Sequence, residues 1–395
     1  MVRKTPIPVN VSELEEILDR YLGSTTRLNY ALKIVGHPGI GKSAIVRETA
    51  IRKNFLFIDT RLAFKENIDL GGYPVPDHEN RRMIYYRPRF IPPEQVPAGY
   101  DGIVWFLDEA NRAHPTVIQT LFQIITENTC GEHPLPEKTF IILAGNLGEG
   151  DDTTITNFDD SALDSRLSIL QLRPTANEWL KWAIRNSIHP SIINYIKLFP
   201  DRLWDEKNIN PNPRGWHQTS LAVQSSYGLE SAAELTNSLR QNVDHTLNRI
   251  IPSLLSESIG NDFIAQQTAP RVLSEQDIIQ GDEKALKALR EKEVPAEDLL
   301  WALSGALFYF RQKNSILQGE LAQNDLLELG NILQFIGYSR PDARVSFFFM
   351  LIKECGVLSQ IPRALKMLKN TAVSDELIPV FTAIMEQEKD LDGAN

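Results

Sequence analysis

One glycine-rich run constrains this chain more than any other feature, because it stands between an apolar segment and a helical one. The run covers residues 36–43 and reads GHPGIGKS. Residues 32–35 before it read as a buried strand, and residues 44–50 after it read as an amphipathic helix. A strand, a glycine loop and a helix in this order predict a parallel α/β fold with a phosphate-binding loop.

Each part of this loop has a chemical task. Glycines let backbone N–H groups turn toward one anion, and the helix that starts near Gly41 adds the positive end of its dipole. Lys42 then reaches the β- and γ-phosphates of a nucleoside triphosphate, and the Ser43 hydroxyl is placed to ligate Mg²⁺. A glycine turn that precedes a helix by chance is the alternative. The residues predicted to bind the nucleotide are Gly36, His37, Pro38, Gly39, Ile40, Gly41, Lys42, Ser43 and Ala44.

The bulk composition is typical of a soluble intracellular enzyme. The chain has 395 residues, enough for two or three domains, and its formal net charge of -10 argues against a surface devoted to nucleic acid. Its two cysteines, Cys130 and Cys355, match no disulfide framework or zinc motif. No signal peptide opens the chain, and apolar stretches such as 345–352 are far shorter than the ~20 residues that span a bilayer. We therefore expect a cytoplasmic protein without membrane contact.

A second apolar run ends in two carboxylates. Residues 103–107 read as a strand buried in the centre of a parallel sheet, and Asp108 and Glu109 follow it directly. The carboxyl end of such a strand lies beside the phosphate loop, so Asp108 is predicted to hold Mg²⁺ through water. Glu109 is predicted to orient and deprotonate the water that attacks the phosphoanhydride. A solvated helix start is the alternative interpretation of the pair.

Three further strands complete the expected sheet. Residues 139–145 end at Asn146, whose amide we expect to position the attacking water near the γ-phosphate, although an asparagine here also suits a turn. Residues 55–59 and 167–172 read as two more strands. The sequence thus predicts a three-layer α/β core with a five-stranded parallel sheet, followed by helical segments.

Taken in order, these motifs resemble the MoxR branch of the AAA+ ATPases, within the dynein-related (AAA_5) subfamily. The resemblance covers roughly residues 5–260 and is carried, beside the phosphate loop, by Asp108 to Ala113, Cys130 to Pro136, Asn146, and Asp164 to Leu167. It implies that ATP is the nucleotide, that Mg²⁺ is the metal, and that the chain assembles into a homo-oligomeric ring, commonly hexameric. It also implies a chaperone-like remodeller of protein partners, often beside a protein with a von Willebrand A domain. Within the first segment, the resemblance places Asn111 near the active site.

Two arginines take their roles from this resemblance. Arg166 matches the arginine finger, which reaches the γ-phosphate bound to a neighbouring subunit, and a planar guanidinium suits that task. The family usually has Phe after this arginine, whereas this chain has Leu167. Arg214 matches the second sensor of the lid and is expected to start a helix. The alternatives are that Arg166 pairs with Asp164 and that Arg214 packs over Trp216. The predicted catalytic residues are Lys42, Asp108, Glu109, Asn146, Arg166 and Arg214, and the predicted metal ligands are Ser43 and Asp108.

Two insertions are candidates for partner contact. Residues 69–76, a turn at 77–80 and residues 81–90 resemble the β-hairpin that this branch inserts and turns toward the ring axis. Its four arginines alternate with aromatic residues, a pattern that also suits single-stranded nucleic acid. A solvated hairpin without a ligand is the third interpretation. The acidic, turn-rich residues 147–154 form the second insertion.

The predicted organisation has three parts: an α/β nucleotide-binding core at 1–173, a helical lid at 174–264 and a helical C-terminal extension at 265–395. Residues 7–9 and the lid are expected to form the adenine pocket. We therefore predict a ring-forming motor that hydrolyses Mg-ATP and remodels a protein partner. A nucleic-acid-directed NTPase, motivated by the arginines at 81–89, and a nucleotide switch with negligible turnover are the alternatives.

Overall fold

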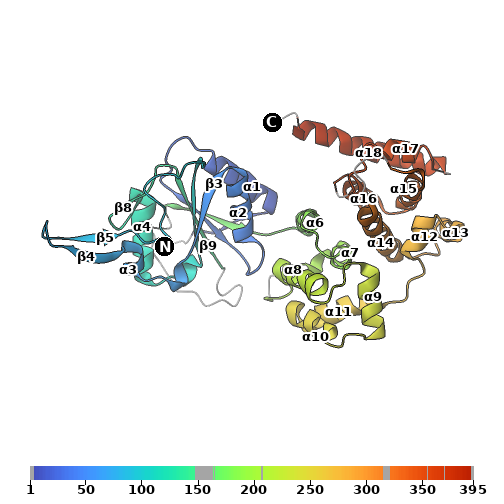
Figure 1. Cartoon of the computed structure of the whole chain (residues 1–395), viewed down its shortest axis with the longest axis horizontal. Helices are drawn as coiled ribbons and strands as arrows, with labels where there is room; N and C mark the ends of the chain where they lie inside the picture. The colour runs from blue at the N-terminus through green and yellow to red at the C-terminus, as the bar shows by residue number, and fades with distance from the viewer. Residues whose placement is uncertain are drawn as a thin grey trace. The chain divides into compact units, whose positions relative to one another are not determined.

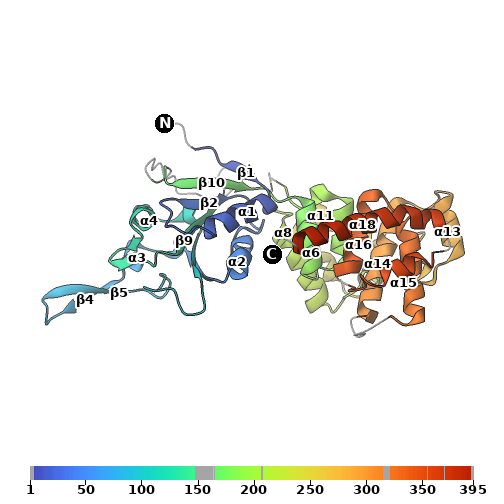
Figure 2. The same cartoon turned by 90° about the horizontal axis from the view of Figure 1, so that it is seen from above.

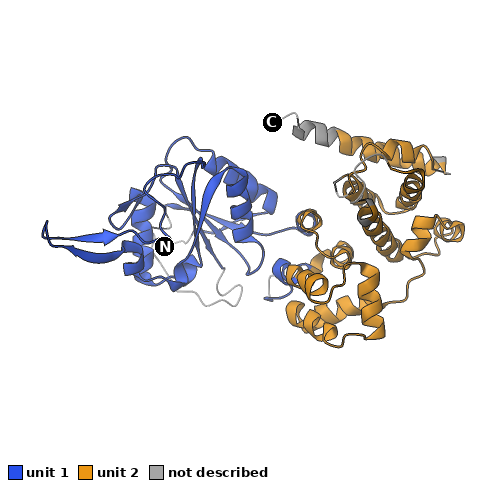
Figure 3. Cartoon of the chain, viewed as in Figure 1, with its two compact units in different colours: residues 1–179, 203–215 blue, residues 180–202, 216–395 orange. Residues whose placement is uncertain are grey.

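The computed structural model divides the chain into two compact units. The first comprises residues 1–179 and 203–215, and the second comprises residues 180–202 and 216–395 (Figure 3). The described residues are 4–146, 163, 165–205, 208–314, 321–353, 355–368 and 370–392. The predicted acidic insertion at 147–154 and Asp164 therefore lie outside the described residues. Within the described ranges, every helix is too short or too polar to span a lipid bilayer.

The first unit is built on a six-stranded sheet in which every neighbouring pair is parallel. The strands stand in the order β1-β10-β2-β9-β6-β3. Their bounds are β1 Ile7–Val9, β2 Ala31–Val35, β3 Phe55–Arg61, β6 Gly102–Asp108, β9 Thr139–Gly145 and β10 Leu167–Leu172. Every residue of the central strand β9 is buried, as expected for a parallel sheet with both faces covered.

All five predicted strands are confirmed, and the count of five is corrected to six by β1. This strand has only three residues, with Pro8 at its centre. It pairs with β10 at the edge of the sheet, where a residue without an N–H group is tolerated. A run this short shows no periodicity, so the sequence pattern does not reveal it.

Alternate residues of β6 pack into two separate cores. The helices of this unit are α1 Val11–Leu22, α2 Lys42–Arg52, α3 Asn67–Gly71 and α4 Pro115–Glu127, with 3₁₀ turns η1 Leu62–Phe64 and η2 Ala110–Arg112. Val104 and Phe106 lie in a cluster with residues of α1 and α2. Trp105 and Leu107 lie in a second cluster with residues of α4. Figure 1 shows these helices on opposite sides of the sheet, which confirms the predicted three-layer core.

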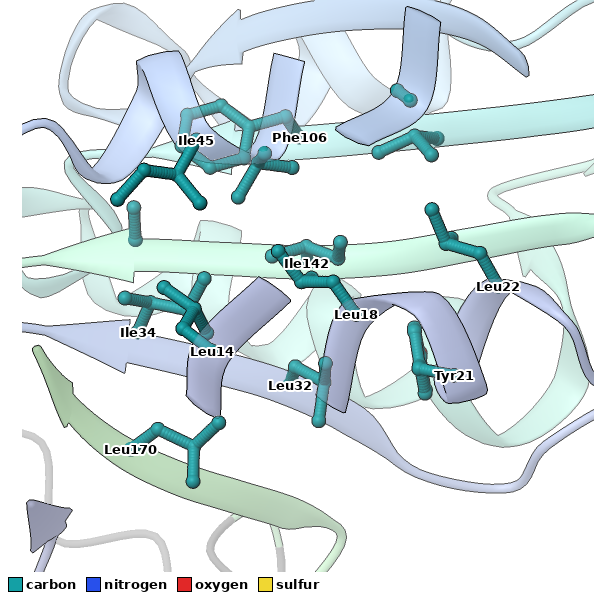
Figure 4. Close-up of a cluster of buried hydrophobic side chains, with 14 of the residues drawn as sticks. Leu14, Leu18, Tyr21, Leu22, Leu32, Ile34, Ile45, Phe106, Ile142 and Leu170 are labelled. Atoms are coloured by element: carbon teal, nitrogen blue, oxygen red, sulfur yellow. The ribbon is translucent and has the colours of Figure 1, made fainter. Parts of the chain in front are cut away.

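Helix α1 shows how the local sequence builds one of these layers. Oδ1 of Asn10 accepts the N–H of Glu13 at 2.9 Å, and the Glu13 carboxylate accepts the N–H of Asn10 at 2.8 Å. This reciprocal cap fixes where the helix begins. Leu14, Leu18 and Tyr21 follow at helical spacing and are buried against the sheet (Figure 4). Full burial of each leucine stabilises the fold by about 1.5–3 kcal/mol.

The predicted hairpin insertion is confirmed as β4 (Tyr73–Asp77) paired antiparallel with β5 (Arg82–Tyr86). It follows α3 and projects away from the rest of the first unit (Figure 2). A second short ladder joins β7 (Thr129–Cys130) to β8 (His133–Pro134). Each pair forms a two-stranded sheet separate from the main one.

The second unit is helical in its described residues, as predicted for the C-terminal part of the chain. Two of its helices, α6 (Ala176–Arg185) and α8 (Pro213–Leu221), begin in the first unit. The others are α7 Pro190–Leu198, η3 Pro200–Arg202, the π-helix η4 Ala222–Ser226, α9 Ala232–Gln241, α10 Leu247–Leu255, α11 Glu257–Thr268, α12 Glu275–Gln280, α13 Glu283–Arg290, α14 Ala296–Asn314, α15 Gln323–Ile336, α16 Pro341–Lys353, α17 Ile361–Leu365 and α18 Thr371–Asp392. Helix α11 runs across the boundary suggested at 264. The division into lid and extension stays a prediction.

Candidate functional site

The predicted phosphate loop connects β2 to α2 over residues 36–41. Gly39 and Gly41 have φ values of +78° and +100°, in the left-handed region that other residues rarely adopt. Gly41 is also the N-cap of α2, so the unpaired N–H groups of the first helical turn lie at the loop. Together with the helix dipole, these groups make this end of α2 attractive to an anion.

Lys42 ties this loop to the end of β9. The residue is 8% exposed, and its Nζ donates to the carbonyl of Gly36 at 2.7 Å and to the carbonyl of His37 at 2.9 Å. The same Nζ donates to Oδ1 of Asn146 at 3.2 Å. A buried ammonium needs such oxygen partners, and these hold it at the loop. The structure thus brings together two predicted site residues, Lys42 at the start of α2 and Asn146 at the end of β9.

The end of β6 supplies the two predicted carboxylates. Oδ2 of Asp108 lies 3.5 Å from Oγ of Ser43, so the end of this strand meets the first turn of α2. Glu109 has a left-handed backbone with φ of 55°, and its N–H donates to Oδ1 of Asp108 at 2.8 Å. For a residue with a Cβ this conformation costs about 1–2 kcal/mol, and such strain clusters at functional sites. Both carboxylates are partly exposed, so water reaches them.

Ser43 and Asp108 have the chemistry that Mg²⁺ requires. This ion prefers hard oxygen ligands, keeps several waters, and is usually held by one or two protein groups together with substrate phosphates. A hydroxyl and a carboxylate with oxygens 3.5 Å apart are donors of this kind. The two residues therefore fit a metal ion that binds together with a nucleotide.

Asn111 holds the residue at the end of β9 from the turn η2. Its Oδ1 accepts the N–H of Asn146 at 3.3 Å, and its Nδ2 donates to the carbonyl of Asn146 at 3.4 Å. One side-chain amide therefore bonds to both backbone groups of Asn146, as a neighbouring strand would. These bonds help to hold Asn146 in its position beside Lys42.

Asp59, near the carboxyl end of β3, is a neighbour of the site that no sequence motif marks. Burial raises the pKa of its carboxyl group, and the negative charge of Asp108 raises this pKa further. The guanidinium of Arg47 opposes both effects from 3.6 Å. The sequence signal for Asp59 is its place directly after the apolar run 55–58, but no second motif residue follows it.

The segment before α8 packs against the phosphate loop. The N–H of Arg214 donates to the carbonyl of Gly39 at 3.1 Å. Asn212 is 6% exposed, and its Oδ1 accepts the N–H of Gly215 at 2.9 Å, a bond of the kind that caps a helix. Arg214 itself is exposed and lies in the first turn of α8, as predicted. Its backbone therefore lies at the loop, while its role as a sensor stays a prediction.

Arg166 lies at the amino ends of the strands, opposite the carboxyl ends that carry the phosphate loop. Its carbonyl accepts the N–H of Ala31, the first residue of β2, at 3.0 Å. Because the phosphate loop follows the last residue of the same five-residue strand, about 16 Å of strand separates the two positions. The Arg166 guanidinium lies 4.4 Å from the ring centroid of Phe122 in α4, and its Nη1 donates to Ser165 Oγ. Within one chain, the structure does not bring Arg166 to Lys42 and Asp108.

Comparison with curated proteins gives a partial match. No family model matches the chain. The chain is 27% identical over 172 residues to the chaperone protein ClpB of Bdellovibrio bacteriovorus. This match covers 41% of the chain but only 18% of ClpB, so the chain spans less than a fifth of that relative's length.

Two solved structures of NtrX from Brucella abortus are also similar to this chain. The complex with ADP has a TM-score of 0.37 and 15% identity, covering 75% of this chain and 63% of NtrX. The complex with ATP has a TM-score of 0.35 and 13% identity, covering 79% and 66%. Because both scores are below 0.5, they assign no function to this chain.

Proposed function

We propose that this chain is an AAA+-type ATPase that hydrolyses the β–γ phosphoanhydride of Mg-ATP. The proposal rests on one observation, the meeting of α2, β6 and β9 at one edge of the sheet. There, Nζ of Lys42 lies 3.2 Å from Oδ1 of Asn146. Beside them, Oγ of Ser43 lies 3.5 Å from Oδ2 of Asp108. A cation, an amide and a metal-binding pair at the end of a glycine loop are the groups that phosphoryl transfer to water requires.

Each group has a separate task in the proposed reaction. The Lys42 ammonium neutralises charge on the β- and γ-phosphates. The Glu109 carboxylate takes a proton from the attacking water, which the Asn146 amide orients. Mg²⁺, when bound with the nucleotide, neutralises charge on the phosphate oxygens. Ser43 would hold this ion directly, and Asp108 would hold it through water.

We further propose that the site is shared between protomers of a ring, for which the resemblance favours six. In one chain, Arg166 stands at the edge of the sheet opposite to the phosphate loop. It can therefore act only on a nucleotide bound by a second copy. A guanidinium stays charged and matches the oxygens of a phosphate, so it can stabilise the charge of the transferred group there.

The proposed substrate of this motor is a protein that contacts the β4–β5 hairpin. Tyr73 and Tyr86 stand opposite each other in this ladder and are 66% and 63% exposed. Met83 on the same hairpin is 49% exposed. Exposed aromatic and methionine side chains are enriched at protein interfaces. The partial similarity to a chaperone supports a protein partner. The resemblance to the MoxR branch adds a protein with a von Willebrand A domain to this proposal.

The arginines of the same hairpin favour a second candidate function, directed at single-stranded nucleic acid. Arg81 and Arg82 stand at the turn, and Nε of Arg82 lies 3.2 Å from the Asp77 carboxylate. Basic side chains beside Tyr85 and Tyr86 combine phosphate contact with base stacking. ATP hydrolysis that an oligonucleotide stimulates in the wild type, but not in an Arg81→Ala, Arg82→Ala double variant, would establish this function. Hydrolysis unaffected by oligonucleotide leaves the protein-directed function.

The catalytic assignment is tested by substituting Glu109 with Gln. Because the amide cannot accept the proton, we expect hydrolysis at least about 10²-fold slower, with ATP affinity unchanged. Glu48→Gln, an exposed position on α2, is the matched control and should leave both quantities unchanged. Steady-state phosphate release and equilibrium ATP titration measure them. Unchanged hydrolysis by Glu109→Gln would refute the assigned role of this carboxylate.

A further inference from the structure

The β4–β5 hairpin has two outer edges that differ in their capacity for hydrogen bonding. In the part of the chain that the structure describes, these two strands pair only with each other, and the hairpin projects from its unit (Figure 2). Each strand therefore has one edge without a neighbouring strand. Backbone groups on such an edge are a template for pairing with another chain.

Two prolines close the edge of β4. Pro74 and Pro76 have no N–H group. In an antiparallel ladder, hydrogen-bonded pairs alternate with pairs that are not hydrogen-bonded. The two prolines therefore occupy the pairs that are not hydrogen-bonded, and their missing donors belong to the outer edge. This edge cannot donate to a further strand at either position.

The edge of β5, by contrast, is complete. Tyr85 stands opposite Pro74 and Met83 stands opposite Pro76, so both residues belong to the pairs that are not hydrogen-bonded. Their N–H and C=O groups therefore point away from β4. No described residue outside the ladder forms a backbone hydrogen bond with them. The β5 edge thus presents two donors and two acceptors at the spacing that a third strand requires.

The side chains beside this edge are apolar on both faces of the hairpin. Successive side chains of a strand alternate between its faces, so Ile84 and Tyr86 lie on one face and Met83 and Tyr85 on the other. Tyr86, Met83 and Tyr85 are 63%, 49% and 37% exposed. A strand added at the β5 edge would cover part of this apolar surface on either face, and we therefore expect it to carry apolar side chains.

The hairpin is basic, although the chain as a whole is acidic. Residues 73–89 contain four arginines and two carboxylates, whereas the formal net charge of the chain is -10. Arg82 and Arg87 are paired with carboxylates. Arg81, directly before β5, and Arg89, shortly after it, are exposed and form no ion pair with a described residue. Charge complementarity therefore favours a segment with an acidic residue near each end.

We propose that the β5 edge binds an extended, acidic and apolar segment of the protein partner as a third strand. This inference rests on the proposed function, in which a protein contacts the hairpin, and it names the conformation that the partner adopts there. Main-chain bonds to Met83 and Tyr85 supply affinity, and the flanking side chains supply selectivity. The backbone of a nucleic acid lacks the alternating donors and acceptors of a strand, so the β5 edge favours a polypeptide.

The test measures the binding of a fluorescein-labelled heptapeptide to the full-length protein by fluorescence anisotropy, without nucleotide. Its five central residues alternate valine and threonine between two terminal aspartates, and we expect saturable binding to the wild type. Met83→Pro removes one outward N–H group, whereas Met83→Ala removes the same side chain and keeps that group. Met83→Pro should bind about tenfold more weakly than Met83→Ala, because one hydrogen bond is lost. Equal affinities would overturn strand pairing and leave the proposed contact between partner and hairpin in place.

Modified peptides test the same bonds without any change to the protein. N-methylation of two adjacent central residues removes one donor from each edge of the peptide and should weaken binding to the wild type at least about tenfold. Unchanged binding of this peptide would also overturn strand pairing. Asparagine in place of both aspartates should weaken binding about threefold at low salt. Equal binding of that peptide would overturn the acidic ends.

Peptide binding and ATP hydrolysis are measured separately, so each can fail alone. Peptide binding without hydrolysis would refute the proposed ATPase and leave the β5 edge as a binding site. Hydrolysis without saturable peptide binding would overturn the β5 edge as a site for a partner strand. In that case, binding of a labelled oligonucleotide would identify nucleic acid as the occupant. A smaller assembly of Met83→Pro than of the wild type in sedimentation would identify a second copy of the chain.

Discussion

At the scale of single residues, the phosphate loop is packed so closely at Gly39 that it leaves no room there for an added methyl group. A Cβ on Gly39 would come 2.6 Å from Oδ1 of Asn212 and 3.1 Å from Cβ of Arg214. The φ of +78° at Gly39 adds strain for any other residue. The loop and the segment before α8 therefore depend on each other for their positions.

We expect Gly39→Ala to weaken ATP binding at least tenfold, because the new methyl group displaces the loop from Asn212. Gly99→Ala is the matched control, since Gly99 has a φ of +92° but a Cβ there would meet no heavy atom within 4 Å. The control should lose about 1 kcal/mol of unfolding free energy through backbone strain and keep its ATP affinity. Isothermal titration measures the affinity. Wild-type affinity in Gly39→Ala would show that this contact does not shape the loop.

Asn111 is expected to act through Asn146, because its amide bonds to both backbone groups of that residue. We expect Asn146→Ala to slow hydrolysis by about 10²-fold and Asn111→Ala to slow it by about tenfold, with ATP affinity unchanged in both. The double variant should be no slower than Asn146→Ala alone, because the positioned group is already gone. Single-turnover rates measure all three. Losses that multiply in the double variant would assign Asn111 an independent role.

At the scale of elements, the helix α7 carries a pH-dependent cap. His189 is fully buried, and its Nδ1 accepts the N–H of Ser191 at 3.2 Å. Burial lowers the pKa of His189 from its ordinary 6.5 to about 4. Below pH 6.5 the unfolded chain therefore binds a proton that the folded chain does not bind until about pH 4. The stabilisation is complete above pH 6.5 and is lost as the pH falls toward 4.

Between pH 7.5 and 5, this linkage should lower the free energy of unfolding by about 2 kcal/mol. His189→Asn retains a capping side chain but removes the titrating group. Its stability should therefore fall by about 2 kcal/mol less than that of the wild type over the same range. Urea unfolding followed by circular dichroism at both pH values measures the difference. Identical pH dependence in the two proteins would exclude His189 as its source.

The elements of the first unit could be predicted where a hydrophobic pattern extends over several consecutive residues. The run 103–107 predicts β6 because it has five consecutive apolar residues, of which Val104 to Leu107 alternate between two cores. β1 could not be predicted, because three residues with a central proline show no such pattern. The hairpin β4–β5 could be placed from its turn residues together with the resemblance to an inserted hairpin, although both of its faces are largely exposed.

Site residues could be predicted where they follow an apolar strand directly or after a glycine loop. Lys42, Asp108 and Asn146 stand at or beyond strand ends, and parallel pairing brings those ends to one edge. The packing of Asn212 on the loop could not be predicted, because it joins segments far apart in the chain. A cavity in the second unit, lined by residues of α6, α7, α14, α16 and the π-helix η4, could not be predicted for the same reason. It exists only once these elements have assembled.

At the scale of the whole molecule, the place of Arg166 decides what one chain can do alone. Its position at the amino end of β10, beside the start of β2, keeps it away from the phosphate loop of its own chain. The proposed motor therefore needs at least two copies, and the proposal combines Glu109 from one copy with Arg166 from the other at each active interface.

The most direct measurement is ATP hydrolysis per protomer against protein concentration, for the wild type, for Arg166→Ala, for Glu109→Gln and for a mixture of the two variants. We predict that wild-type activity per protomer rises with concentration and that each variant alone loses it. Mixing should restore part of the activity, because some interfaces then combine an intact Glu109 with an intact Arg166. Activity independent of concentration, with Arg166→Ala as active as the wild type, would contradict a site shared between protomers.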